Sequence, residues 1–217
     1  MLFRSLLGGD ANFFLLTNLT ANLFYARTDT DGRQGDGTDT YRGVAEYAGD
    51  RYGVSIEHLL IGPNFDPQVG YVRRVDFRKT SLEARFMPRP KSRRSRVRKY
   101  TYLGSLDYVT NAPATIVENK DLRGHVGVEY QNSDQFSADY DRLYEWLPRP
   151  FVISPGVVVP AGGYNYQNAR ASYSLGQQRP VSGRLALARG TLYHGNKRSE
   201  EHTSELQSRF GISYAVF

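Results

Sequence analysis

Cysteine is absent from this chain of 217 residues, and it has only two methionines and one tryptophan. The lack of cysteine excludes a disulfide framework, a cysteine-based zinc site and a thiol nucleophile. No stretch reaches the roughly 18 consecutive apolar residues of a membrane-spanning helix, so a helical membrane protein is excluded as well. Convincing apolar repeats at the helical spacing of about 3.6 residues are also missing. These absences argue against a helical fold.

Tyrosine, glycine and phenylalanine are abundant, with 16, 21 and 11 copies, and the formal net charge is +6. Tyrosine suits surfaces that meet two media, because its ring is apolar and its hydroxyl is polar. The first residues do not form a secretory signal peptide, since Gly8, Gly9 and Asp10 interrupt the apolar run. Either the protein stays in the cytosol or the chain begins in the middle of a longer one, and the rest of the sequence favours the second interpretation.

Apolar and polar residues alternate with a period of two through most of the chain. Leu122, Val126 and Val128, for example, alternate with Arg123 and Glu129. This period is typical of strands with one apolar and one polar face. The predicted strands lie at about residues 4–15, 19–28, 40–48, 51–61, 76–87, 99–109, 115–131, 135–147, 163–175 and 181–194.

The links between these strands alternate in length, with the link at 88–98 as the exception. The short links are those at residues 17–18, 49–50, 132–134 and 176–180. Short turns at one end and long loops at the other are typical of transmembrane β-barrels. We predict an all-β fold, an antiparallel up-and-down transmembrane β-barrel fragment of about ten strands that is incomplete at both ends. The alternative is a soluble barrel with its aromatic residues in the core.

The short turns also predict which residues face one another across each hairpin. The expected cross-strand pairs are Tyr47 with Tyr52 and Arg42 with Glu57, Tyr130 with Phe136 and His125 with Asp141, and Tyr173 with Gly183 and Ser172 with Arg184. Each hairpin then has one apolar and one charged face. The charged face would line the lumen of a barrel, and the predicted lumen-lining residues are Arg42, Glu46, Glu57, Arg123, His125, Glu129, Asp141, Arg170 and Arg184.

Aromatic residues gather near both ends of the strands, which is where a transmembrane barrel carries its aromatic belts. The belt at the short-turn end is predicted from Tyr47, Tyr52, Phe86, Tyr100, Tyr102, Tyr130, Phe136 and Tyr173. The belt at the long-loop end is predicted from Tyr25, Tyr41, Tyr108, Tyr144, Trp146, Tyr164 and Tyr193. This pattern predicts a location in a bacterial outer membrane.

Several segments resemble the barrel region of a bacterial outer-membrane β-barrel family of unknown function. They read IGPNFDPQVGYVRRVDFR, ARFMPRP, VGVEYQNSDQFSADYDRLYEWLPRPF and ASYSLGQQRPVSG, and the most specific part is NFDPQVGYVRR. The resemblance covers most of residues 9–195. Members typically carry an N-terminal carbohydrate-binding-like β-sandwich ahead of the barrel, and this chain has no counterpart of it. The resemblance implies a fold and a location but no activity.

The end of the chain resembles a translated sequencing adapter rather than a natural protein. Residues 198–208 read RSEEHTSELQS and residues 212–217 read ISYAVF, which match one reading frame of the adapter, with a barcode-sized gap between them. We therefore predict that residues 1–197 are the partial barrel and that residues 198–217 are a non-native tail without defined structure. The tail's ISYAVF end has enough β-propensity to form an edge strand.

A basic segment near the middle of the chain is the densest charge feature. It contains the predicted headgroup-binding residues Arg89, Arg93, Arg94, Arg96 and Arg98, together with Lys91 and Lys99. Guanidinium groups can hold the phosphates of membrane lipid or lipopolysaccharide. A solvated turn is the other interpretation. A nucleic-acid site is disfavoured because the nearby aromatic residues lie in strands and do not interleave with the basic ones.

Metal sites and catalytic motifs are weakly represented. The segment TDTDGRQGDGTDT places Asp29, Asp31, Asp36 and Asp39 close together, but a calcium loop would also need a bidentate glutamate, and a flexible acidic loop is preferred. The motifs G-x-S-x-G, S-x-x-K, H-E-x-x-H and G-x-x-x-x-G-K are missing. We predict no metal, no cofactor and no enzymatic activity.

Three functions stay open. The first is a pore or uptake component for polar solutes such as saccharides. The second is a membrane anchor for a carbohydrate-binding-like domain. The third is a surface hydrolase that uses His125 and Asp141 as an acid–base pair. The expected partners are outer-membrane lipid or lipopolysaccharide and possible saccharides, not nucleic acid.

Overall fold

A computed structural model describes residues 4–30, 36–67, 72–92, 94–179, 181–192 and 195–206. These residues form 13 β-strands. The strands are β1 (Arg4–Leu16), β2 (Leu19–Thr30), β3 (Asp39–Ala48), β4 (Tyr52–Ile61), β5 (Phe77–Phe86), β6 (Val97–Thr110), β7 (Val117–Tyr130), β8 (Gln135–Leu147), β9 (Phe151–Ser154), β10 (Val157–Val159), β11 (Gly162–Ser174), β12 (Val181–Leu192) and β13 (Gly195–Leu206). Within the described ranges, no helix has the length and apolar character to cross a membrane.

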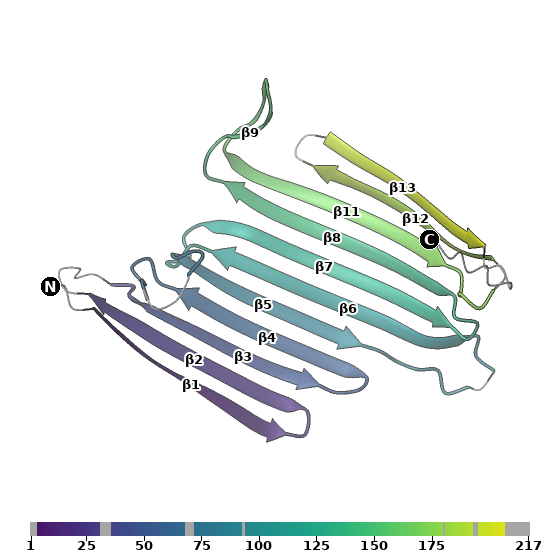
Figure 1. The fold of residues 1–217 in the computed structure, drawn as a ribbon, viewed down its shortest axis with the longest axis horizontal. Coiled ribbons are helices and arrows are strands. Elements are labelled where there is room, and N and C mark those ends of the chain that lie inside the picture. Colours follow the sequence, from purple (N-terminus) through teal and green to yellow (C-terminus); the bar gives the residue numbers. More distant parts are fainter. Residues whose placement is uncertain are drawn as a thin grey trace, which may run out of the picture.

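Eleven strands form one antiparallel sheet in which each strand pairs with the next along the chain (Figure 1). The order is interrupted only between β8 and β11, where β9 and β10 form a separate hairpin that projects from the long-loop end. The predicted all-β, antiparallel, up-and-down arrangement is confirmed. All ten predicted strands are present, with ends that differ by at most two residues, whereas β9, β10 and β13 were not predicted.

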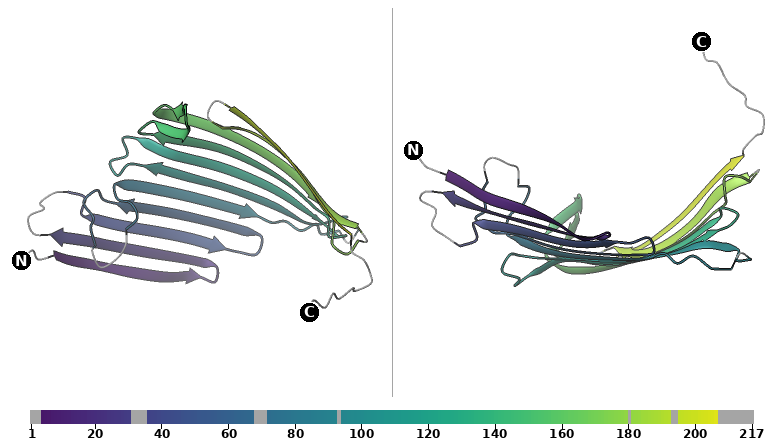
Figure 2. Two further views of the ribbon diagram at one scale, coloured as in Figure 1. Left: turned by 45° about the horizontal axis from the view of Figure 1, so that its top comes forward. Right: turned by 90° about the horizontal axis from the view of Figure 1, so that it is seen from below.

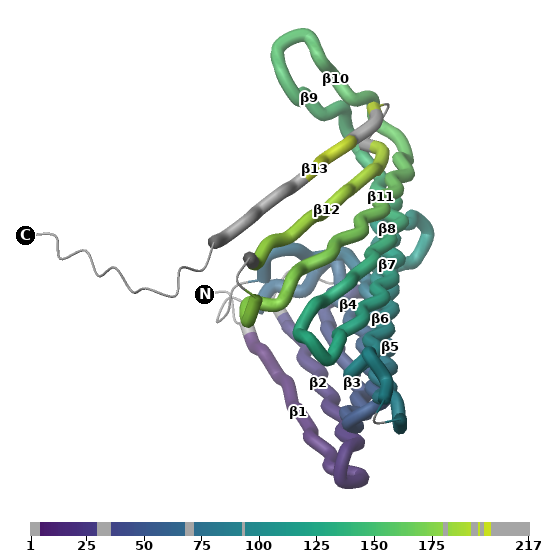
Figure 3. The backbone as a smooth tube through the Cα atoms, turned by 90° about the vertical axis from the view of Figure 1, so that its right-hand side faces the viewer, coloured from purple at the N-terminus to yellow at the C-terminus, as the bar shows by residue number. Residues whose placement is uncertain are grey.

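The sheet is a single curved layer. Figure 2 shows it edge-on as a shallow trough, and Figure 3 shows both edge strands, β1 and β13, turned toward the same side. The strand order is linear, so β1 and β13 are edges and the sheet is not closed. The structure therefore shows a curved open sheet. The closed barrel expected from the sequence stays a prediction.

The continuous register gives the sheet two chemically different faces. One row of directly opposed residues runs from Ile56 through Leu82 and Leu106 to Leu122. The neighbouring row on the other side runs from Glu57 through Ser81 and Asp107 to Asp121. We call the side with the leucine row the apolar face and the other side the polar face. Alternation along each strand produces both.

The apolar face is not covered by any described residue. Ile56, Leu82 and Leu122 at its centre are 49%, 41% and 46% exposed. Buried hydrophobic residues in the described ranges are few and scattered: Ala26, Phe65, Ala112, Val159, Tyr166 and Ala186. The fold thus lacks the hydrophobic core that normally stabilises a water-soluble sheet.

The three predicted hairpin registers are wrong by two residues. Tyr47 lies opposite Val54, Val128 opposite Phe136, and Tyr173 opposite Leu185. In each hairpin the centre of the turn lies one residue from its predicted position. At the β7–β8 turn, for example, the Ser133 N–H bonds to the carbonyl of Tyr130 at 3.0 Å. Because the shift is even, every side chain stays on its predicted face.

Strand β13 contradicts the prediction that residues 198–206 lack defined structure. It pairs with β12 along its whole length. An open edge offers unpaired backbone groups to any segment that follows a tight turn, which explains the pairing. The side chains do not continue the pattern, because Arg198 lies opposite Arg189 and Glu200 opposite Leu187 on the apolar face. The predicted edge strand at residues 212–217 lies outside the described residues, and the adapter origin stays a prediction.

Deleting residues 198–217 should lower the free energy of unfolding by less than about 1 kcal/mol, because the described side chains Arg198 and Glu200 of β13 lie opposite Arg189 and Leu187 and add no apolar packing. Urea unfolding followed by the fluorescence of Trp146 measures this. The matched control deletes residues 1–18, which include the opposite edge strand β1. This deletion should cost more than about 2 kcal/mol, because β1 places Phe13 opposite Ala21 on the apolar face. Equal losses from the two deletions would show that β13 is a native part of the sheet.

Candidate functional site on the polar face

All nine residues predicted to line a lumen lie on the polar face. They come from β3, β4, β7, β8, β11 and β12, and the register places their side chains on one side of the sheet: Arg42, Glu46, Glu57, Arg123, His125, Glu129, Asp141, Arg170 and Arg184. Strand alternation determines this grouping, because residues separated by an even number of positions along a strand point to the same face of the sheet. Whether this face lines a lumen depends on closure of the sheet.

Charged residues on this face form cross-strand pairs. Arg42 and Glu57 form an ion pair at 2.5 Å between Nε and Oε1, as predicted, although the two residues sit diagonally and not directly opposite. Asp107 accepts a hydrogen bond from Ser81 at 2.6 Å and pairs with Lys79 at 3.1 Å. Sequence reasoning missed this cluster because its strands belong to the irregular β5–β6 hairpin.

His125 pairs with Asp139 and not with Asp141, which corrects the sequence-based pair. The distance between His125 Nδ1 and Asp139 Oδ1 is 2.6 Å. The two-residue register shift is the cause, and it places Asp141 opposite Arg123. Arg123 itself donates to Asp121 at 3.1 Å.

A groove of about 330 Å³ opens beside His125 on the polar face. Polar residues dominate its lining: Lys99, Thr101, His125, Glu129, Gln135, Ser137, Ser172, Ser174 and Arg184. The hydroxyls of Ser137 and Ser172 are 2.8 Å apart, and Arg184 Nη2 lies 3.5 Å from Ser172 Oγ. Such a mixture of donors and acceptors suits a small polar solute.

The groove does not contain an assembled catalytic triad. Among the described residues His125 bonds to Asp139, and no hydroxyl hydrogen-bonds to its ring. Gly127 leaves room for the imidazole, since a Cβ added there would lie 3.1 Å from His125 Nε2.

The predicted aromatic belts lie mainly on the apolar face. At the short-turn end, Phe86 stacks with Tyr52 at 4.9 Å and with Tyr102 at 6.0 Å between ring centroids. At the long-loop end, the prediction is wrong for Tyr164. This residue lies on the polar face opposite Glu145, and its hydroxyl donates to the carbonyl of Pro160 at 2.8 Å. Tyr193 lies outside the described residues.

The basic segment lies in the β5–β6 connection at the short-turn end. Arg89 forms two hydrogen bonds with Asp50, at 2.6 and 2.9 Å, and this guanidinium holds the pKa of the Asp50 carboxyl below its usual value. Arg98 pairs with Glu129 at 2.8 Å. Arg94 and Arg96 are exposed, and Arg93 lies outside the described residues.

The acidic segment shows no metal site in its described part. Asp29, Asp36 and Asp39 lie on either side of residues 31–35, which are outside the described ranges and include Asp31. Among the described side chains, no group of three histidine, aspartate or glutamate residues is close enough to hold a metal ion.

Asp134 is the most connected polar residue and was not singled out from the sequence. It is 2% exposed and joins the β7–β8 turn to the β11–β12 turn. The Gly176 N–H donates to its Oδ1 at 2.8 Å, while Tyr173 and Arg179 donate to its Oδ2 at 2.9 and 2.6 Å. The Gly176 N–H, followed by the Tyr173 hydroxyl and Arg179, lowers the pKa of Asp134. Two turns far apart in sequence are thereby fixed together.

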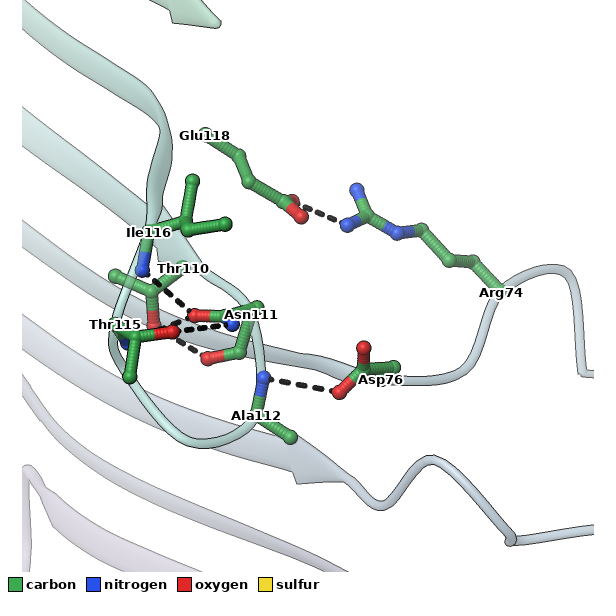
Figure 4. A network of polar contacts seen from close by, with 8 residues as sticks. All are labelled: Arg74, Asp76, Thr110, Asn111, Ala112, Thr115, Ile116 and Glu118. Carbon is green, nitrogen blue, oxygen red and sulfur yellow. Dashed lines mark hydrogen bonds and ion pairs between the residues drawn. The ribbon is translucent and has the colours of Figure 1, made fainter. Parts of the chain in front are cut away.

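A second network fixes the loops at the long-loop end (Figure 4). The Asn111 side chain accepts hydrogen bonds from the N–H groups of Thr115 and Ile116, each at 2.9 Å. Arg74 bonds to Glu118, which ties the β4–β5 loop to the start of β7. This network holds the β6–β7 loop against its neighbour.

Comparison of the chain with known protein families, curated proteins and solved structures finds no match. The resemblance of residues 9–195 to an outer-membrane family therefore stays a prediction. The function has to be argued from the two faces of the sheet.

Replacing Asp134 with asparagine should remove a pH-dependent part of the stability. Because the folded-state pKa is lowered, the carboxylate stabilises the fold above its unfolded-state pKa of about 3.9, and this contribution disappears as the pH falls through the folded-state pKa. The difference in unfolding free energy between the wild type and Asp134→Asn should therefore be constant near neutrality and shrink below about pH 4. Urea titrations at a series of pH values measure it, and a pH-independent difference would refute the role of the charge.

Proposed function

We propose that this sheet is part of the wall of a bacterial outer-membrane β-barrel that passes polar solutes, such as saccharides, along its polar face without catalysing a reaction. The observation that carries the proposal is the single-layer sheet with an uncovered apolar face and a paired, charged opposite face. A lipid bilayer covers an apolar face of this kind, and a water-filled lumen suits the other.

The length and pattern of the strands support a membrane environment. The eleven strands of the sheet contain 10 to 14 residues, enough for a tilted strand to cross the hydrocarbon layer. The aromatic stack around Phe86 lies near the short-turn end, where a membrane interface would lie. Closure is required, because unpaired backbone groups at the edges of a membrane wall would each cost several kcal/mol in lipid. The edges must therefore pair with further strands in the membrane.

The groove beside His125 supports the solute class. Hydroxyl, amide and charged groups line it, including Ser137, Ser172 and Arg184, and such groups match the hydroxyls of a saccharide. The Lys99–Glu129 ion pair beside it, at 3.7 Å, compensates charge locally, so the groove is polar without a strong field of one sign.

Substitutions on opposite faces of β7 test the orientation of the sheet. Val126→Arg on the apolar face should lower the unfolding free energy in phospholipid vesicles by about 2–4 kcal/mol, because it places a charge in lipid. Arg123→Ala on the polar face should cost much less, since it removes an exposed ion pair with Asp121. Leu185→Arg provides a second apolar-face variant on β12. Equal losses for the two classes would contradict the orientation.

Planar-bilayer recordings of the intact protein test transport. We expect discrete conductance steps, and a soluble oligosaccharide should reduce the current by occupying the groove. Arg184→Ala should weaken this block without abolishing the steps, because Arg184 contacts Ser172 in the groove. Insertion without any conductance would favour the anchor function, and ester hydrolysis that is lost in His125→Ala would favour the hydrolase.

A further inference from the structure

The groove beside His125 runs across the strands of the sheet. Figure 1 shows β6, β7, β8, β11 and β12 side by side, and each of these five strands supplies lining residues to the groove. Neighbouring strands lie about 4.8 Å apart, so the four spacings from β6 to β12 correspond to roughly 19 Å. The groove is therefore long in the direction perpendicular to the strands, and a single sugar ring fills only part of it.

Small residues form the floor of the groove. Four of them lie directly opposite one another in a row that crosses β6, β7, β8 and β11: Thr101, Gly127, Ser137 and Ser172. A Cβ added at Gly127 would already lie 3.4 Å from the Thr101 Cβ. The hydroxyls of Ser137 and Ser172 are 2.8 Å apart, and Ser172 is 7% exposed. The floor is therefore low and carries hydroxyl groups.

The next row toward the short turns forms a polar wall beside this floor. It contains one lining residue from each of the five strands, directly opposed in register: Lys99, Glu129, Gln135, Ser174 and Arg184. Because these residues face one another across adjacent strands, polar groups recur along the wall at the strand spacing of about 4.8 Å. The wall offers both hydrogen-bond donors and acceptors.

The groups of the wall are only partly occupied by contacts within the protein. Glu129 pairs with Arg98 at 2.8 Å and more loosely with Lys99 at 3.7 Å. Arg184 Nη2 lies 3.5 Å from the Ser172 hydroxyl. The side chains of Gln135 and Ser174 form no hydrogen bond with another described side chain. The centre of the wall is therefore available to a ligand, and so are donors at both of its ends.

We propose that this groove binds a linear oligosaccharide that lies across the strands, and not a single sugar. Successive rings rest on the floor between Thr101 and Ser172. Their hydroxyls bond to Gln135 and Ser174 at the centre of the wall. A linear chain of sugar rings presents hydroxyls at regular intervals, as the wall presents its polar groups. The inference rests on the proposed function, because it specifies which saccharides the polar face takes.

Calorimetric titration of the full chain measures how binding depends on the length of the saccharide. The ligands are glucose and the cello- and malto-oligosaccharides of two to six rings, and the detergent is lauryldimethylamine oxide, which has no sugar headgroup to compete. In at least one series, each added ring should strengthen binding about threefold to tenfold, as one net hydrogen bond does. The gain should end at about four rings, because the groove crosses four strand spacings.

Substitutions at the two ends of the wall test the direction of the ligand. Lys99 on β6 and Arg184 on β12 lie four strand spacings apart, so one glucose molecule cannot contact both. Lys99→Gln and Arg184→Gln should each weaken tetrasaccharide binding about fivefold, and the double variant about 25-fold. Glucose binding should respond to one of them at most. A ligand that lies along the strands would respond to only one of them at any length.

A substitution in the floor tests whether the rings rest there. Ser137→Leu should weaken tetrasaccharide binding at least about tenfold but glucose binding less than about threefold, because glucose still fits at either end. The matched control is Ser55→Leu, which changes a half-buried serine of the polar face on β4, outside the groove, and should change neither. If Ser137→Leu fails to fold, Gln135→Ala and Ser174→Ala should each weaken tetrasaccharide binding about fivefold.

Three results would overturn the oligosaccharide site: no gain in affinity from glucose to the tetrasaccharide in either series, a gain that stops at two rings or continues to six, or sensitivity to only one end of the wall. The proposed pore is judged separately by conductance. A protein that conducts but lacks the length dependence loses only the oligosaccharide site. One that shows the length dependence but does not conduct loses only the pore.

Discussion

Removal of the apolar face from water is the condition on which the rest of this structure depends. An eleven-stranded sheet satisfies its internal backbone groups by pairing, but pairing does not cover the side chains of Ile56, Leu82 and Leu122. A soluble sheet covers such a face with helices or with a second sheet, whereas the described residues contain no helix and their second sheet is only the β9–β10 hairpin, which projects from the long-loop end. Hydrocarbon is the one solvent that covers a whole face without adding protein mass. The exposed apolar face and the proposed membrane location therefore have the same physical cause.

The polar face follows the opposite rule and is stabilised by pairing of charges. Its partners come from adjacent strands, such as Arg42 with Glu57 and Lys79 with Asp107, so each pair also fixes the register locally. Exposed pairs of this kind contribute little to stability individually. Their effect is to leave a polar surface on which several charges are compensated locally, as the proposed passage of a neutral polar solute would require. Unpaired cations are found instead at the end of the sheet, in the β5–β6 connection.

Strand positions and side-chain faces could be predicted because both depend on the period of two, which each strand displays in its own sequence. Turn centres could not, because they depend on contacts outside the hairpin. Asp134, for example, belongs to the β7–β8 turn but binds Gly176 and Arg179 of another turn. The resulting shift replaced Asp141 with Asp139 as the partner of His125. The β9–β10 hairpin was missed because seven strand residues around a tight turn are too few to show a period.

The two edges of the sheet show how backbone pairing differs from side-chain complementarity. Strand β1 places Phe13 and Ala11 opposite Ala21 and Leu23, so it extends the apolar face. Strand β13 forms as complete a ladder with β12, yet it places Arg198 against Arg189 on the same face. Hydrogen bonding accepts almost any sequence at an open edge, whereas a lipid-facing surface accepts few. The side-chain pattern, and not the presence of a ladder, is therefore the better criterion for which strands would belong to the proposed membrane wall, and by that criterion the proposed wall would run from β1 to β12.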